Sequence, residues 1–489
     1  MELSVQSLQE KYTSKEISTV DCIKDVFQTI RDKDSHLKAF LALNEAASLK
    51  EAERIDQKRA KGQSLGKLAG VPIAIKDNLM TIGMPTTCSS KILEGYMSPY
   101  NATVVEKLKA EDAIIIGKTN LDEFAMGSST ENSAFGASRN PWDITRAPGG
   151  SSGGSAVAVA GDEVVLGLGS DTGGSIRQPA SFCGVVGMKP TYGRVSRYGL
   201  VAFASSLDQI GPFSKNVRDA ALLLEVISGK DPMDATSVDK EPPLYTNAIE
   251  KGVKGVKIGV PKEYFIEGVD PEVKKSIKDT IDVYEKLGAH MSEITLPHTE
   301  YCIAVYYIIA TAEASSNLAR YDGVEYGYRA SGKLGLKDMY KETRGQGFGP
   351  EVKRRILLGT YALSSGYYDA YYLKAQKART LIKQDFDKAF EAVDLVLTPT
   401  SPTTAFRLGE KTDDPLNMYL SDVFTISANL AGLPGISLPC GFDKSGLPVG
   451  LQLLGRAFEE SAVLEAAHAY EQATDHHKQK PKFETESSA

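Results

Sequence analysis

Cysteine, histidine and long apolar runs are scarce in this sequence of 489 residues. The five cysteines show no CxxC spacing, so we expect neither a disulfide framework nor a metal site. No run approaches the ~20 apolar residues of a transmembrane helix, and no secretory leader is visible, so we expect a cytoplasmic protein without membrane contact. The net charge of −7 argues against tight, sequence-independent binding of nucleic acid by this chain alone.

The apolar pattern predicts an α/β protein. Residues 1–65 have the periodicity of helices, and in residues 66–230 short apolar strands alternate with glycine-rich turns and short helices. Residues 302–390 are helical in pattern and rich in tyrosine, with strand-like segments on both sides. We therefore expect one domain spanning 1–489 that carries this helical insertion, and a disordered polar tail over 477–489.

Glycine-rich turns suggest a nucleotide site, but both motifs fail. Residues 117–119 read Gly-Lys-Thr, as at the end of a P-loop, yet the first glycine of that motif is replaced by Asp112. Residues 167–169 begin a dinucleotide fingerprint whose third glycine is replaced by Thr172. These glycines are better explained as tight turns between strands and helices.

Three remaining elements indicate serine-based hydrolysis. Lys76 ends the apolar run 70–75, Ser151 and Ser152 lie between paired glycines, and Ser175 closes an Asp-Thr-Gly-Gly-Ser run. A buried lysine becomes a neutral base if its pKa falls by about three units, or ~4–5 kcal/mol. Paired glycines let backbone N–H groups converge on an oxyanion. The alternatives are a lysine that reaches water and serines that cap helices.

Two other nucleophiles compete with Ser175. The run Gly-Ser-Ser-Gly-Gly also matches the G-x-S-x-G elbow, which would make Ser152 the nucleophile and would need a histidine base. No histidine lies between residues 37 and 289, and only His468 falls on an apolar helical pattern. A cysteine amidohydrolase is disfavoured because Cys88 and Cys183 have no nearby histidine, which is typical of small core residues. A serine–lysine mechanism needs fewer assumptions.

Lys76 and the runs 149–154 and 171–177 resemble the amidase-signature family. The resemblance implies an α/β fold with a large mixed β-sheet covered by helices on both sides. It implies that Lys76 is the base, that Ser151 follows a cis peptide bond and relays the proton, and that Ser175 is the nucleophile. It also implies an oxyanion hole formed by Thr172, Gly173 and Gly174. The side chains implied to support the site are those of Ser152, Asp171 and Arg177.

Within that family, the runs 118–133, 351–356 and 417–422 resemble the A subunits of glutamyl-tRNA(Gln) amidotransferases. This resemblance implies a binding site for the substrate amino acid, formed by Tyr306, Arg355 and Asp422. An arginine can pair with an α-carboxylate through two hydrogen bonds, and an aspartate with an α-ammonium. The residues alone leave open that the arginine lies on a solvated helix face and that the aspartate caps a helix.

The resemblance also implies partners. A glutaminase subunit would hydrolyse glutamine and pass the ammonia to a B subunit. The B subunit would bind tRNA and convert Glu-tRNA(Gln) to Gln-tRNA(Gln) with ATP and Mg. A small C subunit would complete the complex. No cofactor is expected in this chain, and tRNA is expected to be bound mainly by the partner. The alternatives are a free-standing amidase that acts on other amides and a non-catalytic scaffold of an RNA-modifying complex.

Overall fold

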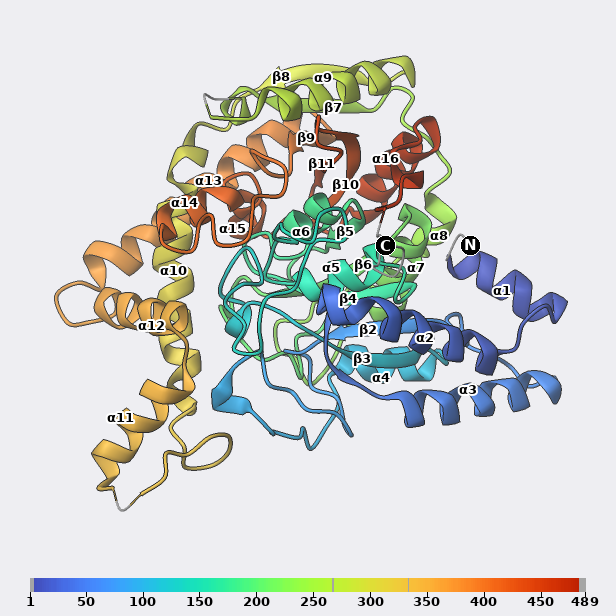
Figure 1. Cartoon of the computed structure of the whole chain (residues 1–489). Coiled ribbons are helices and arrows are strands. Elements are labelled where there is room, and N and C mark those ends of the chain that lie inside the picture. The colour runs from blue at the N-terminus through green and yellow to red at the C-terminus, as the bar shows by residue number, and fades with distance from the viewer. Residues whose placement is uncertain (1–3, 266–267, 333, 483–489) are drawn as a thin grey trace.

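The computed structural model describes residues 4–265, 268–332 and 334–482. Within these residues, eleven strands form one sheet through the centre of the molecule (Figure 1), in the order β1-β3-β2-β4-β6-β5-β10-β11-β9-β7-β8. The strands are β1 Phe40–Leu43, β2 Pro72–Lys76, β3 Ile114–Thr119, β4 Leu166–Asp171, β5 Val186–Lys189, β6 Gln209–Ser214, β7 Lys257–Pro261, β8 His290–Ile294, β9 Leu395–Pro399, β10 Gly435–Phe442 and β11 Pro448–Gly455.

The sheet is mixed. Strands β3, β2 and β4 are parallel, with Ile73 aligned to Ile115 and to Leu166. Strands β9, β7 and β8 are parallel at the other end. Antiparallel pairs connect these two parallel groups through β6, β5, β10 and β11. The predicted large mixed sheet is confirmed.

Helices surround the sheet (Figure 1). The α-helices are α1 Val5–Ser14, α2 Thr19–Leu37, α3 Glu45–Ala60, α4 Thr103–Ala110, α5 Gly153–Ala160, α6 Arg177–Cys183, α7 Val217–Ile227, α8 Tyr245–Ala248, α9 Pro271–Lys286, α10 Cys302–Asn317, α11 Leu336–Gly347, α12 Pro350–Ala362, α13 Lys374–Ala392, α14 Pro415–Tyr419, α15 Ile426–Ala431 and α16 Glu460–Ala473.

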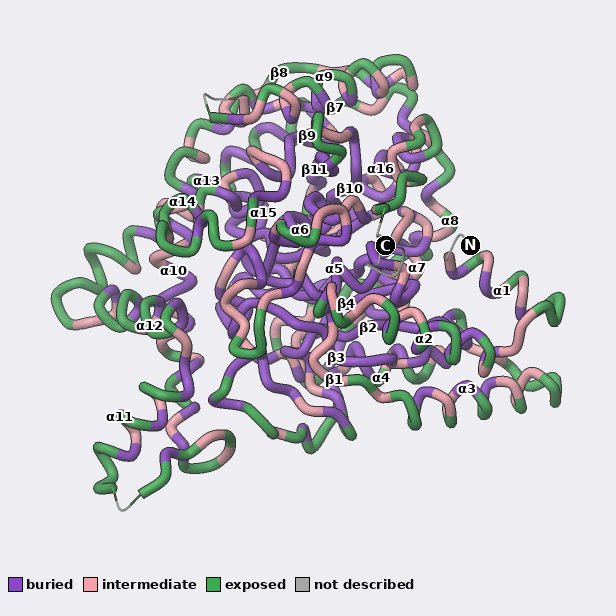
Figure 2. The backbone as a smooth tube through the Cα atoms, viewed as in Figure 1, coloured by how far each residue is buried: buried purple, intermediate pink, exposed green. Residues whose placement is uncertain are grey.

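The two faces of the sheet belong to two cores. Successive side chains of a strand point to opposite faces, so Ile73 and Ile75 of β2 pack into a core with α4, α7 and α16. Ala74, between them, packs with α2, α3 and α5. Figure 2 shows the resulting pattern, in which the central strands are buried while the outer surfaces of α3 and α9 are exposed. The predicted cover of helices on both sides is therefore confirmed.

Helix α2 illustrates how local sequence starts an element. Ser18 accepts a hydrogen bond from the N–H of Asp21 at 3.0 Å, and the Asp21 carboxylate accepts one from the N–H of Ser18 at 3.3 Å. This capping box satisfies donors that the first helical turn leaves without partners. Ile23, Phe27 and Ile30 then follow one another along the buried face.

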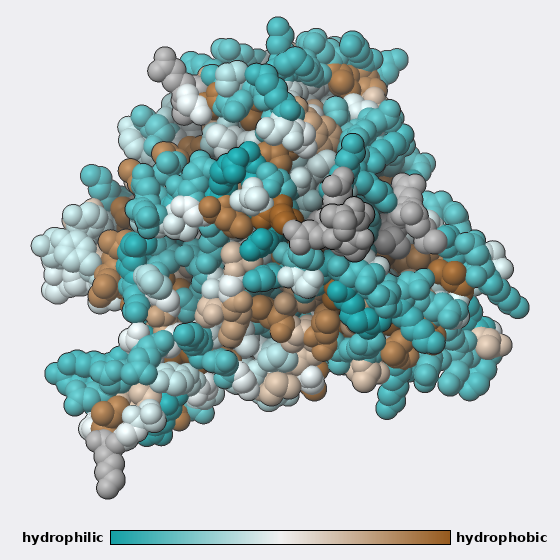
Figure 3. All heavy atoms as spheres, in the orientation of Figure 1, coloured by the Kyte–Doolittle hydropathy of each residue, from teal (hydrophilic) through white to brown (hydrophobic). Residues whose placement is uncertain are grey.

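The tyrosine-rich segment 302–390 contains α10 to α13 and lies at the left of Figure 1. It follows β8 and precedes β9, and both strands belong to the same sheet. Of the expected tail 477–489, residues 477–478 lie in a short 3-10 helix, and 483–489 lie outside the described residues. Among the described helices, none combines the length and apolarity needed to cross a membrane. Figure 3 shows mainly hydrophilic side chains over α9 and around α3.

The sheet brings two chemically important strand ends together. Lys76 is the last residue of β2 and Asp171 is the last residue of β4. Because these parallel strands are neighbours, their carboxyl ends meet at one edge of the sheet. Ser151 and Ser152 precede α5, and Ser175 precedes α6, so all three serines lie in turns that lead into helices.

Candidate active site

Lys76 is fully buried, and its surroundings are hydroxyl groups. Its Nζ atom lies 2.8 Å from Ser151 Oγ, 2.7 Å from Ser152 Oγ and 3.0 Å from Ser170 Oγ. Burial lowers the pKa of Lys76 to about 7, although more distant aspartates raise it in part. The alternative of a lysine that reaches water is wrong, because the side chain has no exposed surface. A lysine in this state can accept a proton near neutral pH.

The serines around Lys76 do not act as helix caps. Ser152 stands at the start of α5, but its side chain makes no capping hydrogen bond. Instead it contacts Lys76 and donates to the carbonyl oxygen of Ser170 at 3.0 Å. Asn78 Nδ2 donates to Ser170 Oγ at 2.9 Å. The capping interpretation of Ser152 is therefore wrong, and its hydroxyl belongs to the network that holds the lysine.

The turns that carry Ser151 and Ser175 are joined beside this network. The Gly150–Ser151 peptide bond is cis, as the family resemblance implied. The N–H of Ser152 donates to the carbonyl oxygen of Ser175 at 3.2 Å, which joins the two serine-bearing turns. Ser151 and Ser152 have no exposed surface, whereas Ser175 is 7% exposed. Ser175 is thus the serine of the three that an incoming substrate can reach.

The turn before Ser175 differs from the expectation at one residue. The N–H of Gly174, whose φ is +140°, donates to Asp171 Oδ1 at 2.8 Å. It is therefore already used by a buried carboxylate that needs donors. Within the described residues, the N–H groups of Thr172 and Gly173 make no hydrogen bond. We accordingly reduce the candidate oxyanion donors from three residues to Thr172 and Gly173.

Asp171 and Arg177 form a buried ion pair under the same turn. Arg177 donates through Nε at 3.0 Å and through Nη2 at 3.1 Å to the two carboxylate oxygens. Burial is the largest single influence and would raise the pKa of Asp171, but the charge and hydrogen bonds of Arg177, together with Lys189 and Asn429, outweigh it and lower the pKa to about 2. Asn429 and Gln452 each accept one further hydrogen bond from the guanidinium, at 2.5 and 2.6 Å. A pair so fully bonded supports the turn and is not available as an acid or base.

The three expected substrate-binding residues lie close together. Tyr306 packs on the turn, since a Cβ atom on Gly173 would lie 2.6 Å from its ring. Burial raises the pKa of the Tyr306 phenol, the charge of Arg355 opposes this shift, and the charge of Asp422 adds to it. Both charges therefore lie near the tyrosine, although α10, α12 and the segment after α14 are far apart in the sequence.

Arg355 is buried, so the alternative of a solvated helix face is wrong for this residue. Its Nε donates to Glu351 Oε1 at 2.8 Å, one turn earlier on α12. Its guanidinium carbon lies 5.2 to 5.6 Å from the centres of three aromatic rings, those of Phe203, Tyr307 and Tyr419. Aromatic faces stabilise a desolvated cation without consuming its hydrogen-bond donors. Arg355 can therefore still bind a carboxylate.

Asp422 is also buried, in the 3-10 helix Leu420–Asp422. Its Oδ2 atom accepts a hydrogen bond from the Ser128 hydroxyl, while Oδ1 has no partner among the described residues. Burial raises the pKa of Asp422 to about 7, and Ser128 and Arg355 both oppose this rise. Its side chain does not bond a helix N–H, so the capping interpretation is wrong. A buried, unpartnered carboxylate oxygen is a natural position for a cationic group.

Four residues of the site were missed in the sequence. Ser170 is the last residue but one of β4, before Asp171, and the pairing of β2 with β4 would have placed it near Lys76. Asn78, Ser128 and Gln178 carry no comparable signal, because each acts through partners that are distant in the sequence. Only the folded chain brings them together.

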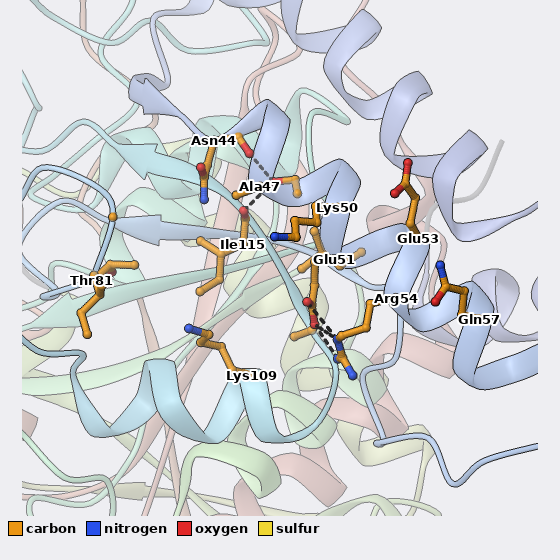
Figure 4. A pocket seen from close by; sticks show the side chains of 15 residues that line it. Asn44, Ala47, Lys50, Glu51, Glu53, Arg54, Gln57, Thr81, Lys109 and Ile115 are labelled. Carbon is orange, nitrogen blue, oxygen red and sulfur yellow. Dashed lines mark hydrogen bonds and ion pairs between the residues drawn. The ribbon is translucent and has the colours of Figure 1, made fainter.

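One large cavity lies away from this chemistry (Figure 4). It has a volume of about 620 Å³ between α3, α4 and β3, and none of the residues above lines it. Two of its charged residues, Arg54 and Glu51, form an ion pair with each other. A smaller cavity of about 360 Å³ is lined by Arg355, Glu351 and Tyr419 and opens beside the expected substrate site. The location of the reactive side chains therefore favours the smaller cavity.

Comparison with known proteins gives the family. The family model named Amidase matches residues 21–464. The A subunit of the glutamyl-tRNA(Gln) amidotransferase of Carboxydothermus hydrogenoformans is 62% identical over 481 residues, which cover 98% of this chain and 99% of that protein. The corresponding protein of Moorella thermoacetica is 60% identical, with 98% of each chain covered.

Solved structures agree. The crystal structure of the A subunit of the glutamyl-tRNA(Gln) amidotransferase of Thermotoga maritima is 45% identical, with a TM-score of 0.79 over 96% of this chain and 98% of that one. The native peptide amidase of Stenotrophomonas maltophilia is 32% identical, with a TM-score of 0.84 over 99% of both chains. The chain belongs to the amidase-signature family and is an amidotransferase enzyme of that family.

Proposed function

We propose that this chain is the glutaminase subunit of a tRNA-dependent amidotransferase. The observation that carries the proposal is Lys76, a fully buried lysine with a pKa of about 7 that contacts Ser151 at 2.8 Å. Around Tyr306, whose ring packs on the turn before Ser175, buried Arg355 and buried Asp422 offer opposite charges, which match the two charged groups of a free amino acid. The names of the similar amidotransferase proteins support the assignment to glutamine.

The proposed reaction begins with proton transfer. Neutral Lys76 takes the hydroxyl proton of Ser151 while Ser151 takes that of Ser175, whose oxygen attacks the side-chain amide carbon of glutamine. The N–H groups of Thr172 and Gly173 bind the oxyanion. The relay then returns the proton to the amide nitrogen, the C–N bond breaks, and ammonia leaves a glutamyl ester on Ser175. Water, deprotonated by the same relay, hydrolyses the ester to glutamate.

Substrate selection follows from the buried charges. The guanidinium of Arg355 would bind the α-carboxylate, and Asp422 Oδ1 would bind the α-ammonium. The ring of Tyr306 packs against Gly173 and would hold the substrate close to that residue. Because Asp422 Oδ1 has no partner among the described residues, an amide that lacks the α-ammonium would leave this buried carboxylate without a cation, which is costly. An amide that lacks the α-carboxylate would leave Arg355 bonded to Glu351 alone.

Ammonia would be the useful product. We infer that it passes to a B subunit, which binds tRNA, activates glutamate on tRNA(Gln) with ATP and Mg, and converts it to glutamine, in a complex that also contains a C subunit. The reaction would take place in the cytoplasm. The chain itself would need no cofactor in this scheme, because every proton in the glutaminase step is moved by Lys76, Ser151 or Ser175.

The proposal is tested with labelled glutamine, with and without co-expressed partner subunits. We expect ammonia release and, after acid quenching, a glutamyl adduct on the peptide that contains Ser175. Undiminished glutaminase activity in Ser175→Ala would refute it, and turnover restricted to amides that are not amino acids would favour a free-standing amidase. Unchanged activity in Lys76→Ala, together with inactivity of a His468 variant, would restore the histidine mechanism.

A further inference from the structure

Gln178 bridges two backbone segments in the interior of the site. It lies near the start of α6 and is fully buried. Its Oε1 atom accepts a hydrogen bond from the N–H of Gly150 at 2.9 Å, and its Nε2 atom donates to the carbonyl oxygen of Ser128 at 2.9 Å. A single amide group therefore holds both segments at once.

Each of these segments ends at a functional group. The Ser128 hydroxyl donates to Asp422, the residue expected to bind the substrate ammonium. Gly150 is joined by its peptide bond to Ser151, whose hydroxyl contacts Lys76. A continuous chain of bonds thus leads from the carboxylate of Asp422 through Ser128 and Gln178 to the serine that relays the proton.

The bridge has little freedom to absorb a displacement. The N–H of Gln178 donates to the carbonyl oxygen of Gly174 at 2.8 Å, which fixes its backbone beside the nucleophile. A Cβ atom on Gly149 would collide with Gln178 Oε1, so the backbone before Ser151 packs directly on the amide. In a close-packed interior, a shift at one end of such a bridge is passed to the other end.

Substrate binding would change the ionisation of Asp422, the residue at the far end of the bridge. Asp422 is buried, and its Oδ1 atom has no partner among the described residues. A cation placed there favours the ionised carboxylate, and an ionised carboxylate is a stronger acceptor for the Ser128 hydroxyl. Binding of the ammonium group therefore tightens the Ser128 end of the bridge.

We propose that Gln178 is a positioning residue that couples occupation of Asp422 to the placement of Ser151. Amides that carry an α-ammonium group are then turned over faster, in addition to being bound more tightly. This inference rests on the function proposed above, because it requires that Asp422 binds the substrate ammonium. It explains why a neutral amide side chain, which can neither accept nor supply a proton in the reaction, is buried between the two sites.

The test compares two substrates in the full chain, co-expressed with its partner subunits. Glutamine is compared with glutaramate, which keeps the carboxylate and the amide but lacks the α-amino group. In Gln178→Leu, we expect kcat for glutamine to fall roughly 10- to 100-fold, since occupation of Asp422 by the α-ammonium no longer acts on Ser151 through the bridge. The kcat for glutaramate should change much less, so the preference for glutamine in kcat collapses. An equal fall for both substrates, or a retained preference, would overturn the inference.

Two further variants keep the test decisive. Ser128→Ala removes the hydrogen bond to Asp422 at the other end of the bridge and should abolish the same preference for glutamine in kcat. When it is combined with Gln178→Leu, we expect little further loss in kcat. Asn140→Leu is the matched control, because buried Asn140 also accepts from a backbone N–H, that of Trp142 at 3.0 Å, and donates to a carbonyl oxygen, that of Phe182 at 2.9 Å. It has no bond to Asp422 or Ser128 and should affect both substrates equally.

The same measurements distinguish failure of the coupling from failure of the proposed function. If the wild-type enzyme does not hydrolyse glutamine, the proposed function fails and the coupling fails with it. If the wild-type enzyme prefers glutamine and both Gln178→Leu and Ser128→Ala keep that preference in kcat, only the coupling fails.

Discussion

The ends of β2 and β3 carry two buried lysines with opposite surroundings. The strands are parallel neighbours, and Lys118 of β3 is aligned with Ile75, the residue before Lys76. Both lysines are fully buried. Lys118 Nζ lies 3.0 Å from Asp77 Oδ1 and donates to Thr86 Oγ1 at 3.1 Å, so it is one half of a buried ion pair.

Among the described residues, the amine of Lys76 contacts hydroxyl and carbonyl oxygens and no carboxylate. Hydroxyl groups can bond a neutral amine as well as a charged one, whereas a buried carboxylate requires a cation beside it. Burial is therefore not what makes one of these lysines a base. The absence of a carboxylate next to Lys76 leaves desolvation as the dominant influence on its pKa.

Removal of Lys76 should have the largest effect on catalysis. In Lys76→Met the relay loses its base, and we expect kcat to fall by about a thousandfold or more. The unfolding midpoint in urea should change little or rise, because a desolvated amine is replaced by an apolar side chain of similar length. Activity assays and urea titration of the same preparation test this, and a variant with near-normal kcat would show that Lys76 is not the base.

The matched change in Lys118 should damage stability instead. Lys118→Met leaves the Asp77 carboxylate buried without its cation, which typically costs about 3–5 kcal/mol. We expect a lower urea midpoint and a reduced yield, while the kcat of the folded fraction, measured by active-site titration, stays near that of the wild type. If Lys118→Met instead abolished kcat with unchanged stability, the contrast between the two lysines would be lost.

A carboxylate placed beside Lys76 should make it resemble Lys118. The pKa of Lys76 is about 7, so kcat/KM of the wild type should rise with pH through about 7 as the amine loses its proton. Ser152→Asp favours the charged amine and should move this limb upward by about 1–3 units. Glutaramate is the suitable substrate, since glutamine binding also depends on Asp422, whose pKa of about 7 gives a limb in the same direction.

One outcome of the Ser152→Asp experiment would contradict this prediction. An acid limb that stays in place in Ser152→Asp, with activity lowered evenly at all pH values, would mean that the limb does not report Lys76. Ser152→Thr serves as the control, because it keeps the hydroxyl group and should leave the limb where it is.

The smallest effect is expected at Ser170. Ser170→Ala removes one hydroxyl that accepts from Lys76, and loss of one neutral hydrogen bond corresponds to about 0.5–1.5 kcal/mol, or a fall of ~3- to 10-fold in kcat. Because the charged amine loses an acceptor, the acid limb should move to lower pH. Ser170→Thr should restore both values, and failure of this rescue would argue that the variant acts through packing.

The catalytic turns were predictable because their composition is unusual. Paired glycines beside serines, together with a lysine at the end of an apolar strand, indicated Lys76, Ser175 and the pair Ser151 and Ser152 before any tertiary contact was known, and the family resemblance then implied Ser151. Several buried strands were indicated by their apolar runs, but β1, β5, β6, β8 and β11 were not recognised. Strand β1 interrupts residues 1–65, which were expected to be helical, and β8 is largely polar and exposed because it lies at the edge of the sheet.

The supporting contacts were not predictable. Ser128 and Asp422 are 294 residues apart, and Arg177 and Gln452 are 275 apart. No local periodicity reports such pairs, since a polar residue has the same sequence signal whether it faces water or a buried partner. The use of the Gly174 N–H by Asp171 was missed for the same reason, because it depends on the fold of one turn around a carboxylate.

The sequence by itself determined the α/β pattern and the kinds of reactive group, since these depend on local periodicity and on the chemistry of individual side chains. The tertiary structure decided their state. It buried Lys76 among hydroxyls and Lys118 beside Asp77, and it left one oxygen of Asp422 without a partner among the described residues. Protonation, charge pairing and access depend on which atoms surround a group, and that environment exists only when distant segments of the chain pack together.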